Sequence, residues 1–65
     1  MNDIQFAIID YMRMQPRGSP IVKVARHCML SYSAAYANLE VLSALGVLGK
    51  TFVRGLAWYR FVREL

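Results

Sequence analysis

The spacing of hydrophobic residues changes once in this chain, at Gly46, and this change restricts the possible folds more than any other feature. Before Gly46, apolar residues recur every three or four positions, which is typical of helices with one buried face. After Gly46, the stretches "KTFV" and "AWYRFV" are rich in β-branched and aromatic residues, which favour strands. We therefore predict an α+β protein that is mainly α, with helices first and strands last.

A first helix is predicted over "DIQFAIIDYMRM", residues 3–14, with Asn2 or Asp3 as its cap. Phe6 and Ile9 fall on a different side of this helix from the predicted core stripe. We expect them to contact a second molecule, and packing beneath the strands is the alternative. The predicted core stripe consists of Ile4, Ala7, Ile8 and Tyr11.

A second helix is predicted after the breaker "QPRG", residues 15–18. Ser19 is expected to cap it, and Pro20 fits the first turn, where no amide donor is needed. The spacing i, i+3, i+4, i+7 places four residues inward: Ile21, Val24, Ala25 and Cys28. Three residues of this helix then point outward: Lys23, Arg26 and His27.

A third, longer helix is predicted after the turn "MLSYS", with Ser31 as its cap and Gly46 as a left-handed end. Two helices joined by a tight turn, the second one longer, form a helix-turn-helix pattern. Its predicted inward face consists of Ala35, Leu39, Leu42 and Gly46, and the opposite face of Ser33, Tyr36, Ala37, Glu40 and Ala44.

A hairpin is predicted at the C-terminal end, because "RG" at residues 54–55 separates the two strand-like stretches and glycine tolerates positive φ. Tyr59 and Phe61 should share one face, with Trp58 and Arg60 on the other. Three helices followed by a two-stranded β-hairpin wing make a winged helix-turn-helix. We predict a single domain of this kind over residues 1–65.

The composition agrees with one small cytoplasmic domain. With 65 residues and one cysteine, the chain forms no internal disulfide, so the core or a second copy must supply the stability. The mean hydropathy of +0.31 suggests that some apolar surface is used for self-association. The N-terminus begins with polar and acidic residues, and polar residues interrupt the charge-poor stretch 27–49. We therefore expect no signal peptide and no membrane span.

The basic charge is concentrated near the C-terminus. The formal net charge is +4 and the pI is about 9.7. Residues 31–49 carry only one charged side chain, an acidic one, whereas residues 50–65 carry four basic side chains against one acidic, a net +3. A basic segment beside a charge-poor helix indicates binding to a polyanion along its backbone, with solubility charge as the alternative.

Three stretches carry a resemblance to a known family: "IIDYM", "VARHCMLSYSAAYANLEVLSALGVL" and "RGLAWYRFV". The chain resembles the small winged-helix transcription regulators of fimbrial operons, the Pap and Fae pilus regulators. The resemblance implies a DNA-binding regulator that acts with a larger, leucine-responsive regulator. It also implies a recognition helix over residues 32–45 and a wing over residues 50–62.

The side chains available for DNA divide into two kinds. Cations on the second helix and the hairpin can hold phosphates, and Arg54 can also enter a minor groove. Hydroxyls and small side chains of the third helix can contact base edges or thymine methyl groups, but the outer face of this helix has no arginine, asparagine or glutamine for strong base readout. The predicted DNA-binding residues are Lys23, Arg26, Ser31, Tyr32, Ser33, Tyr36, Ala37, Lys50 and Arg54.

No catalytic, metal or cofactor site is expected. His27 and Cys28 are adjacent on a helix and point about 100° apart, and no second ligand pair occurs. We predict a nucleoid-associated transcription regulator that binds double-stranded DNA as a homodimer or with a second regulatory protein. The alternative is a co-regulator that docks a larger DNA-binding protein through the third helix. A nonspecific architectural role is a further possibility.

Overall fold

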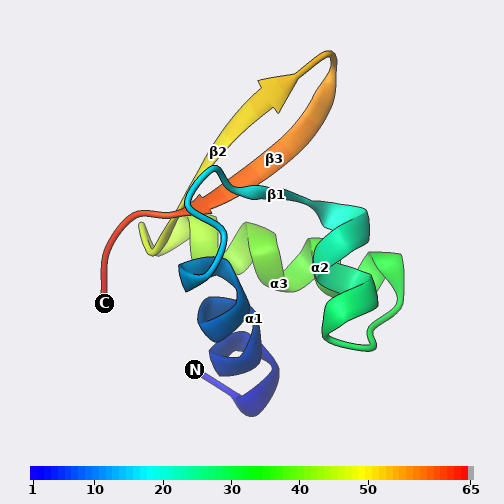
Figure 1. Ribbon diagram of the computed structural model, residues 1–65. Coiled ribbons are helices and arrows are strands. Elements are labelled where there is room, and N and C mark those ends of the chain that lie inside the picture. Colours follow the sequence, from blue (N-terminus) through cyan, green and yellow to red (C-terminus); the bar gives the residue numbers. More distant parts are fainter. Residues whose placement is uncertain (65) are drawn as a thin grey trace.

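The protein is described by a computed structural model that covers residues 1–64 and contains three helices and a three-stranded antiparallel sheet (Figure 1). This arrangement confirms the predicted α+β class, and Leu65, the last residue of the predicted domain, lies outside the described residues. The helices are α1 (Asp3–Arg13), α2 (Ile21–His27) and α3 (Tyr32–Ala44); the strands are β1 (Ser19–Pro20), β2 (Leu48–Val53) and β3 (Leu56–Phe61), in the sheet order β1-β3-β2.

The predicted caps of α1 and α3 are confirmed. Asn2 accepts a hydrogen bond from the Gln5 amide at 2.9 Å, and the Gln5 side chain accepts one from the Asn2 amide at 3.1 Å. This reciprocal capping box fixes the start of α1. Ser31 caps α3 by accepting from the Ala34 amide at 3.1 Å. Gly46, with φ +82°, ends α3 in the left-handed conformation that glycine favours.

The predicted cap of α2 is wrong. This helix begins at Ile21, and Pro20 occupies the cap position without any side-chain hydrogen bond. Ser19 instead pairs with Tyr59 as part of β1, and its buried hydroxyl donates to the Pro20 carbonyl at 3.0 Å. Gly18, with φ +85°, turns the chain against β3 and makes this pairing possible. The predicted two-stranded hairpin is therefore two strands of a three-stranded sheet.

The predicted inward face of α1 is only partly correct. Ile8 is buried, but Ile4 is 41% exposed and Ala7 is also exposed, whereas Ile9 and Met12 are buried at 3% and 0%. The physical reason is that α1 packs against both α3 and β3, which turns its buried face toward Ile9. Ile9 therefore belongs to the core and is not available for the predicted contact with a second molecule.

The remaining core follows the predicted faces of α2 and α3. The inward residues of α2 are buried or partly buried, and its outward residues are exposed. The hairpin formed by β2 and β3 extends away from the helices, and its base closes the core (Figure 1). The core consists of Ile8, Ile9, Met12, Ile21, Val24, Ala25, Ala35, Leu39, Leu42, Val47, Leu48 and Tyr59.

Candidate nucleic-acid interface

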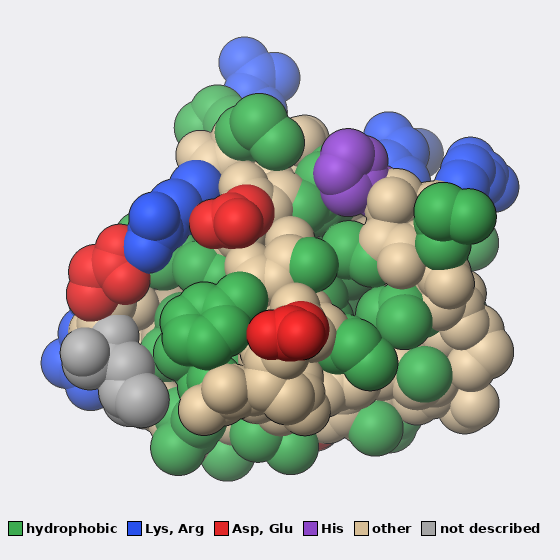
Figure 2. Space-filling model, turned by 90° about the horizontal axis from the view of Figure 1, so that it is seen from below, with side chains coloured by type: hydrophobic (Ala, Val, Ile, Leu, Met, Phe, Trp, Pro, Cys, Tyr) green, Lys and Arg blue, Asp and Glu red, His purple; other side chains and the backbone are tan. Residues whose placement is uncertain are grey.

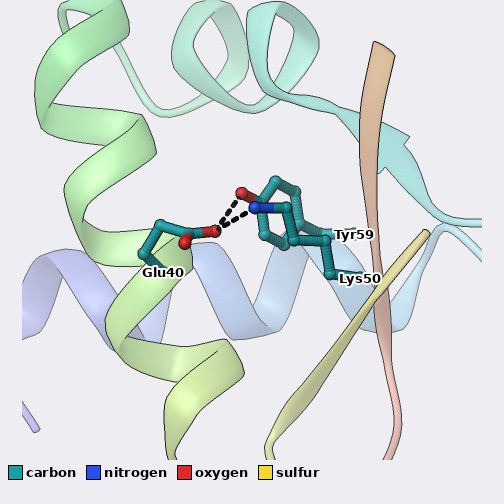
Figure 3. A network of polar contacts seen from close by, with 3 residues as sticks. All are labelled: Glu40, Lys50 and Tyr59. Carbon is teal, nitrogen blue, oxygen red and sulfur yellow. Dashed lines mark hydrogen bonds and ion pairs between the residues drawn. The ribbon is translucent and has the colours of Figure 1, made fainter. Parts of the chain in front are cut away.

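A polar network joins α3 to the sheet (Figure 3). Glu40 of α3 accepts a hydrogen bond from the Lys50 ammonium of β2 at 3.0 Å and another from the Tyr59 hydroxyl of β3. These two donors lower the pKa of the Glu40 carboxyl below its usual value. Burial and the neighbouring carboxylate raise the pKa of the Tyr59 hydroxyl. Glu40 is therefore ionised at neutral pH, and Lys50 neutralises it.

Aromatic rings surround the Lys50 ammonium. Its nitrogen lies 6.0 Å from the ring centroid of Tyr36, 5.6 Å from that of Phe52 and 5.7 Å from that of Tyr59. Rings at this distance attract a cation through their negative faces. Lys50 was predicted to contact DNA, but its ammonium is already bound to Glu40. Its charge serves first to compensate the only carboxylate of α3.

The outer face of α3 presents aromatic and small side chains. Tyr32 and Tyr36 are 59% and 44% exposed, and Ser33 and Ala37 are also exposed. The Ser31 hydroxyl lies 3.4 Å from the Ser33 hydroxyl, in addition to capping the helix. These five predicted site residues lie at the surface, as DNA contact requires. Because Glu40 is neutralised, this face has no uncompensated charge.

The two predicted cations of α2 lie toward α1. Lys23 and Arg26 line an open hollow of about 320 Å³ together with Tyr11 and His27. The His27 ring stacks on Tyr11 with 4.3 Å between the ring centroids. The structure therefore brings Lys23 and Arg26 close to each other, beside Tyr11 of α1.

Apolar residues, rather than these cations, connect α2 with α3 and the hairpin. A hollow of about 80 Å³ lies where the three elements meet, and it is lined by Val22 of α2, Tyr32 of α3 and Leu56 of β3. Val22 and Leu56 are 50% and 63% exposed. The space is too small for a drug-sized ligand, since such sites typically measure a few hundred cubic ångströms. It is a shallow depression in the apolar surface that α2, α3 and β3 form together.

The hairpin tip combines one cation with several exposed apolar side chains. Arg54 and Gly55 form the turn with φ +52° and +81°, the pattern of a type I′ turn. Arg54 is exposed and has no ion pair with any of residues 1–64. Phe52, Val53 and Leu56 beside it are 66%, 42% and 63% exposed. These three residues were not predicted as site residues from the sequence, although apolar residues next to a turn are unusual and could have marked them.

The carboxylates lie away from the hairpin tip. Glu64 pairs with Arg13, and Asp3 and Asp10 belong to α1. Figure 2 views the molecule from the side opposite the hairpin and shows acidic side chains set among many hydrophobic ones. The hairpin from Leu48 to Phe61 contains no Asp or Glu. The side of the molecule that carries the hairpin is therefore the favourable one for a polyanion.

Within residues 1–64, no group of three or more metal-ligating side chains comes together. None of the three described helices has the length and apolar character that crossing a membrane requires. Cys28 is a partly buried free thiol, and burial raises its pKa, so it carries no activated thiolate.

Comparison of the chain with family models, with curated proteins and with solved structures found no match.

Proposed function

We propose that the protein is a winged helix-turn-helix transcription regulator that binds double-stranded DNA. The order α1-β1-α2-α3-β2-β3, with a tight turn before α3 and a projecting hairpin after it, supports this proposal. In such a protein α3 lies in the major groove, and the hairpin follows the adjacent backbone or minor groove. The resemblance to the fimbrial regulators favours the same function.

The observation that carries the proposal is the neutralisation of Glu40. A free carboxylate on the recognition helix would repel the phosphates that flank the major groove. Lys50 and Tyr59 bind this carboxylate from the sheet side, so the α3 face approaches DNA without a net negative charge. Attraction then comes from Arg54 at the hairpin tip, which has no acidic partner within residues 1–64.

Each element would make a different kind of contact. Arg54 would hold a phosphate or enter the minor groove, and Lys23 and Arg26 would hold the backbone on the other side of the helix-turn-helix. The hydroxyls of α3 would bond base edges or phosphates, and Ala37 would touch a thymine methyl group. One domain of this size covers few base pairs, so a second copy or another regulator would complete the site. Phe6, 52% exposed, remains available for that contact.

A second function is favoured by the composition of the α3 face. Tyr32 and Tyr36 are exposed, and neither of them is accompanied by a base-reading side chain. Exposed tyrosines are frequent anchors of protein–protein interfaces. In this alternative, α3 docks a larger DNA-binding protein, and the chain itself binds DNA weakly.

Selection from a randomised duplex library at low and moderate salt tests the first function. We expect sequencing of the retained duplexes to reveal an enriched motif, with a two-fold repeat if a dimer binds. Arg54→Ala should weaken binding to all duplexes and reduce the slope of log affinity against log salt by about one, as for one lost phosphate contact.

Arg17→Ala is the matched control, because Arg17 is an exposed cation in the loop between α1 and β1. An equal loss with Arg17→Ala would show that only the net charge matters. Retention that disappears with salt and leaves no motif would contradict sequence-specific binding and favour the docking function. Capture of the partner through Tyr32 and Tyr36 would then be the next measurement.

A further inference from the structure

We propose that the hairpin tip is an apolar wedge that enters the minor groove of duplex DNA and bends the duplex. The wedge consists of Phe52, Val53 and Leu56 around Arg54. This inference rests on the proposed function, since it assigns a specific contact and a specific deformation to the same DNA. It concerns the shape of the bound duplex, which the proposed function leaves open.

The hairpin tip is exposed on both of its faces. Val53 and Leu56 are direct cross-strand partners in the last pair before the turn, and Phe52 pairs with Ala57. Because side chains alternate along a strand, Phe52 lies on one face of the hairpin, and Val53 and Leu56 lie on the other. All three exceed 40% exposure, so the core does not account for them. Both faces of the tip therefore carry exposed apolar side chains, on either side of Arg54 at the turn.

Arg54 occupies a turn position that disfavours arginine. Type I′ turns favour Asn, Asp or Gly at their first central position, because φ is positive there. Arg54 adopts φ +52° at this position, against the intrinsic preference of its backbone. Local folding energy therefore does not explain an arginine here, whereas a contact with a phosphate or a narrow minor groove does.

Charge complementarity selects DNA as the binding partner of the tip. The hairpin has no carboxylate, and because Lys50 is bound to Glu40, its cations without an ion pair among residues 1–64 are Arg54 and Arg60. An apolar tip made for a neutral protein surface has no need of this uniform sign. Minor-groove proteins that kink DNA combine arginine with inserted side chains such as Phe and Leu, which unstack a base step.

The dimensions of the groove explain why bending accompanies insertion. Two paired strands lie about 4.8 Å apart before their side chains are added. The minor groove of B-DNA is about 6 Å wide, so a tip with Phe52 on one face and Leu56 on the other does not fit unless the groove opens. Opening occurs most easily at flexible steps such as TpA. The wedge should therefore prefer such steps and bend the duplex toward the major groove.

The test uses a duplex of about 30 base pairs with a fluorescent donor and acceptor at its ends, at low salt. One version has a central TpA step, and the other has an ApA step. We expect the wild-type protein to raise energy transfer more in the first. The variant F52S/L56S should bind about tenfold more weakly and leave the bound duplex straight. The control M14S/V62S changes exposed apolar residues outside the tip and should behave as wild type.

The outcomes separate the wedge from the proposed function. If the wild-type protein binds both duplexes without bending them, or if F52S/L56S bends them as much as the wild type does, the wedge proposal is wrong. The proposed DNA-binding function is then unaffected. If the wild-type protein binds neither duplex, both proposals fail. Anionic phosphatidylserine vesicles provide a third probe. Vesicle binding that F52S/L56S abolishes, with no bending of DNA, would make the tip a lipid-binding surface and overturn the wedge.

Discussion

Strand β3 passes through two regions of opposite character, which Tyr59 and Leu56 represent. Tyr59 is completely buried, pairs with both neighbouring strands and donates its hydroxyl to Glu40 of α3. Leu56, three residues earlier, is 63% exposed and pairs only with Val53. The base of the hairpin is thus part of the core, whereas its tip stands in solvent.

This difference teaches which residues the fold itself explains. Burial of large apolar side chains supplies most of the stability of a small domain, so residues such as Tyr59 have a structural reason to be where they are. Exposed apolar residues at a projecting tip gain little from folding, and clusters of them usually mark a binding surface. Folding and binding are therefore separated along one strand.

The largest expected effect on stability comes from substituting Tyr59, and Leu56 is the residue to compare with it. Tyr59→Ala should lower the free energy of unfolding by about 3–5 kcal/mol, because it empties a fully buried site. This is about as much as a core of this size supplies, so the variant should be largely unfolded. Leu56→Ala should change stability by less than about 0.5 kcal/mol. Urea denaturation followed by circular dichroism measures both free energies of unfolding. Comparable losses in the two variants would contradict the division between a buried base and an exposed tip.

The second effect compares two glycines with nearly the same backbone. Gly18 has φ +85°, and an added Cβ would lie 2.5 Å from the Tyr59 carbonyl oxygen; Gly55 has φ +81° and no atom within 4 Å of that position. Gly18→Ala should therefore lower the free energy of unfolding by about 2–3 kcal/mol, and Gly55→Ala by about 1 kcal/mol. Thermal denaturation compares them. Equal losses would mean that β1 does not approach β3 closely.

The parts of the fold that could be predicted depend on signals within a few residues. Ser31 precedes an apolar repeat, Gly46 follows it, and Arg54–Gly55 separates two strand-like stretches, so the ends of α3 and the hairpin turn were predictable. The inward face of α2 followed from its spacing for the same reason. In each case the sequence determines the local conformation, whichever element packs against it.

The parts that could not be predicted depend on contacts between distant residues. Ser19 resembles a helix cap locally, but pairing with Tyr59 makes it a strand residue. Ile9 is buried because α1 packs against two elements at once, which its own spacing does not reveal. In the candidate site, the partners of Glu40 come from β2 and β3, so the neutralisation of this carboxylate was invisible before the elements were placed.

A third effect concerns pH and the network at the base of the hairpin. The folded pKa of Glu40 lies below its usual value of 4.5, so its contribution to stability is complete above pH 4.5 and is lost as pH falls through the folded pKa. The melting temperature of Glu40→Gln should therefore be lower than that of the wild type at neutral pH, and the gap should narrow in acid.

The alkaline side of the same network has the opposite sign. The folded pKa of Tyr59 lies above its usual value of 10.0, so stability should fall as pH rises beyond 10.0.

Glu64→Gln is the control for the acid experiment with Glu40→Gln, because the pair of Glu64 with Arg13 is exposed and should contribute little. If Glu64→Gln lowers the melting temperature at neutral pH as much as Glu40→Gln does, and loses that effect in acid to the same extent, the network has no special role.

The smallest expected effect on stability is that of glycine at the two strained positions, and it separates folding from DNA binding at single residues. Met29 and Arg54 are the two residues other than glycine with positive φ, +57° and +52°, among residues 1–64. Met29→Gly and Arg54→Gly should each raise the free energy of unfolding by about 0.5–1 kcal/mol, since glycine adopts this conformation without strain. Only Arg54→Gly should weaken binding to duplex DNA. Urea denaturation and fluorescence anisotropy with a labelled duplex measure the two quantities. If Arg54→Gly stabilises the fold and binds as tightly as Met29→Gly, the arginine at the tip is not there for DNA.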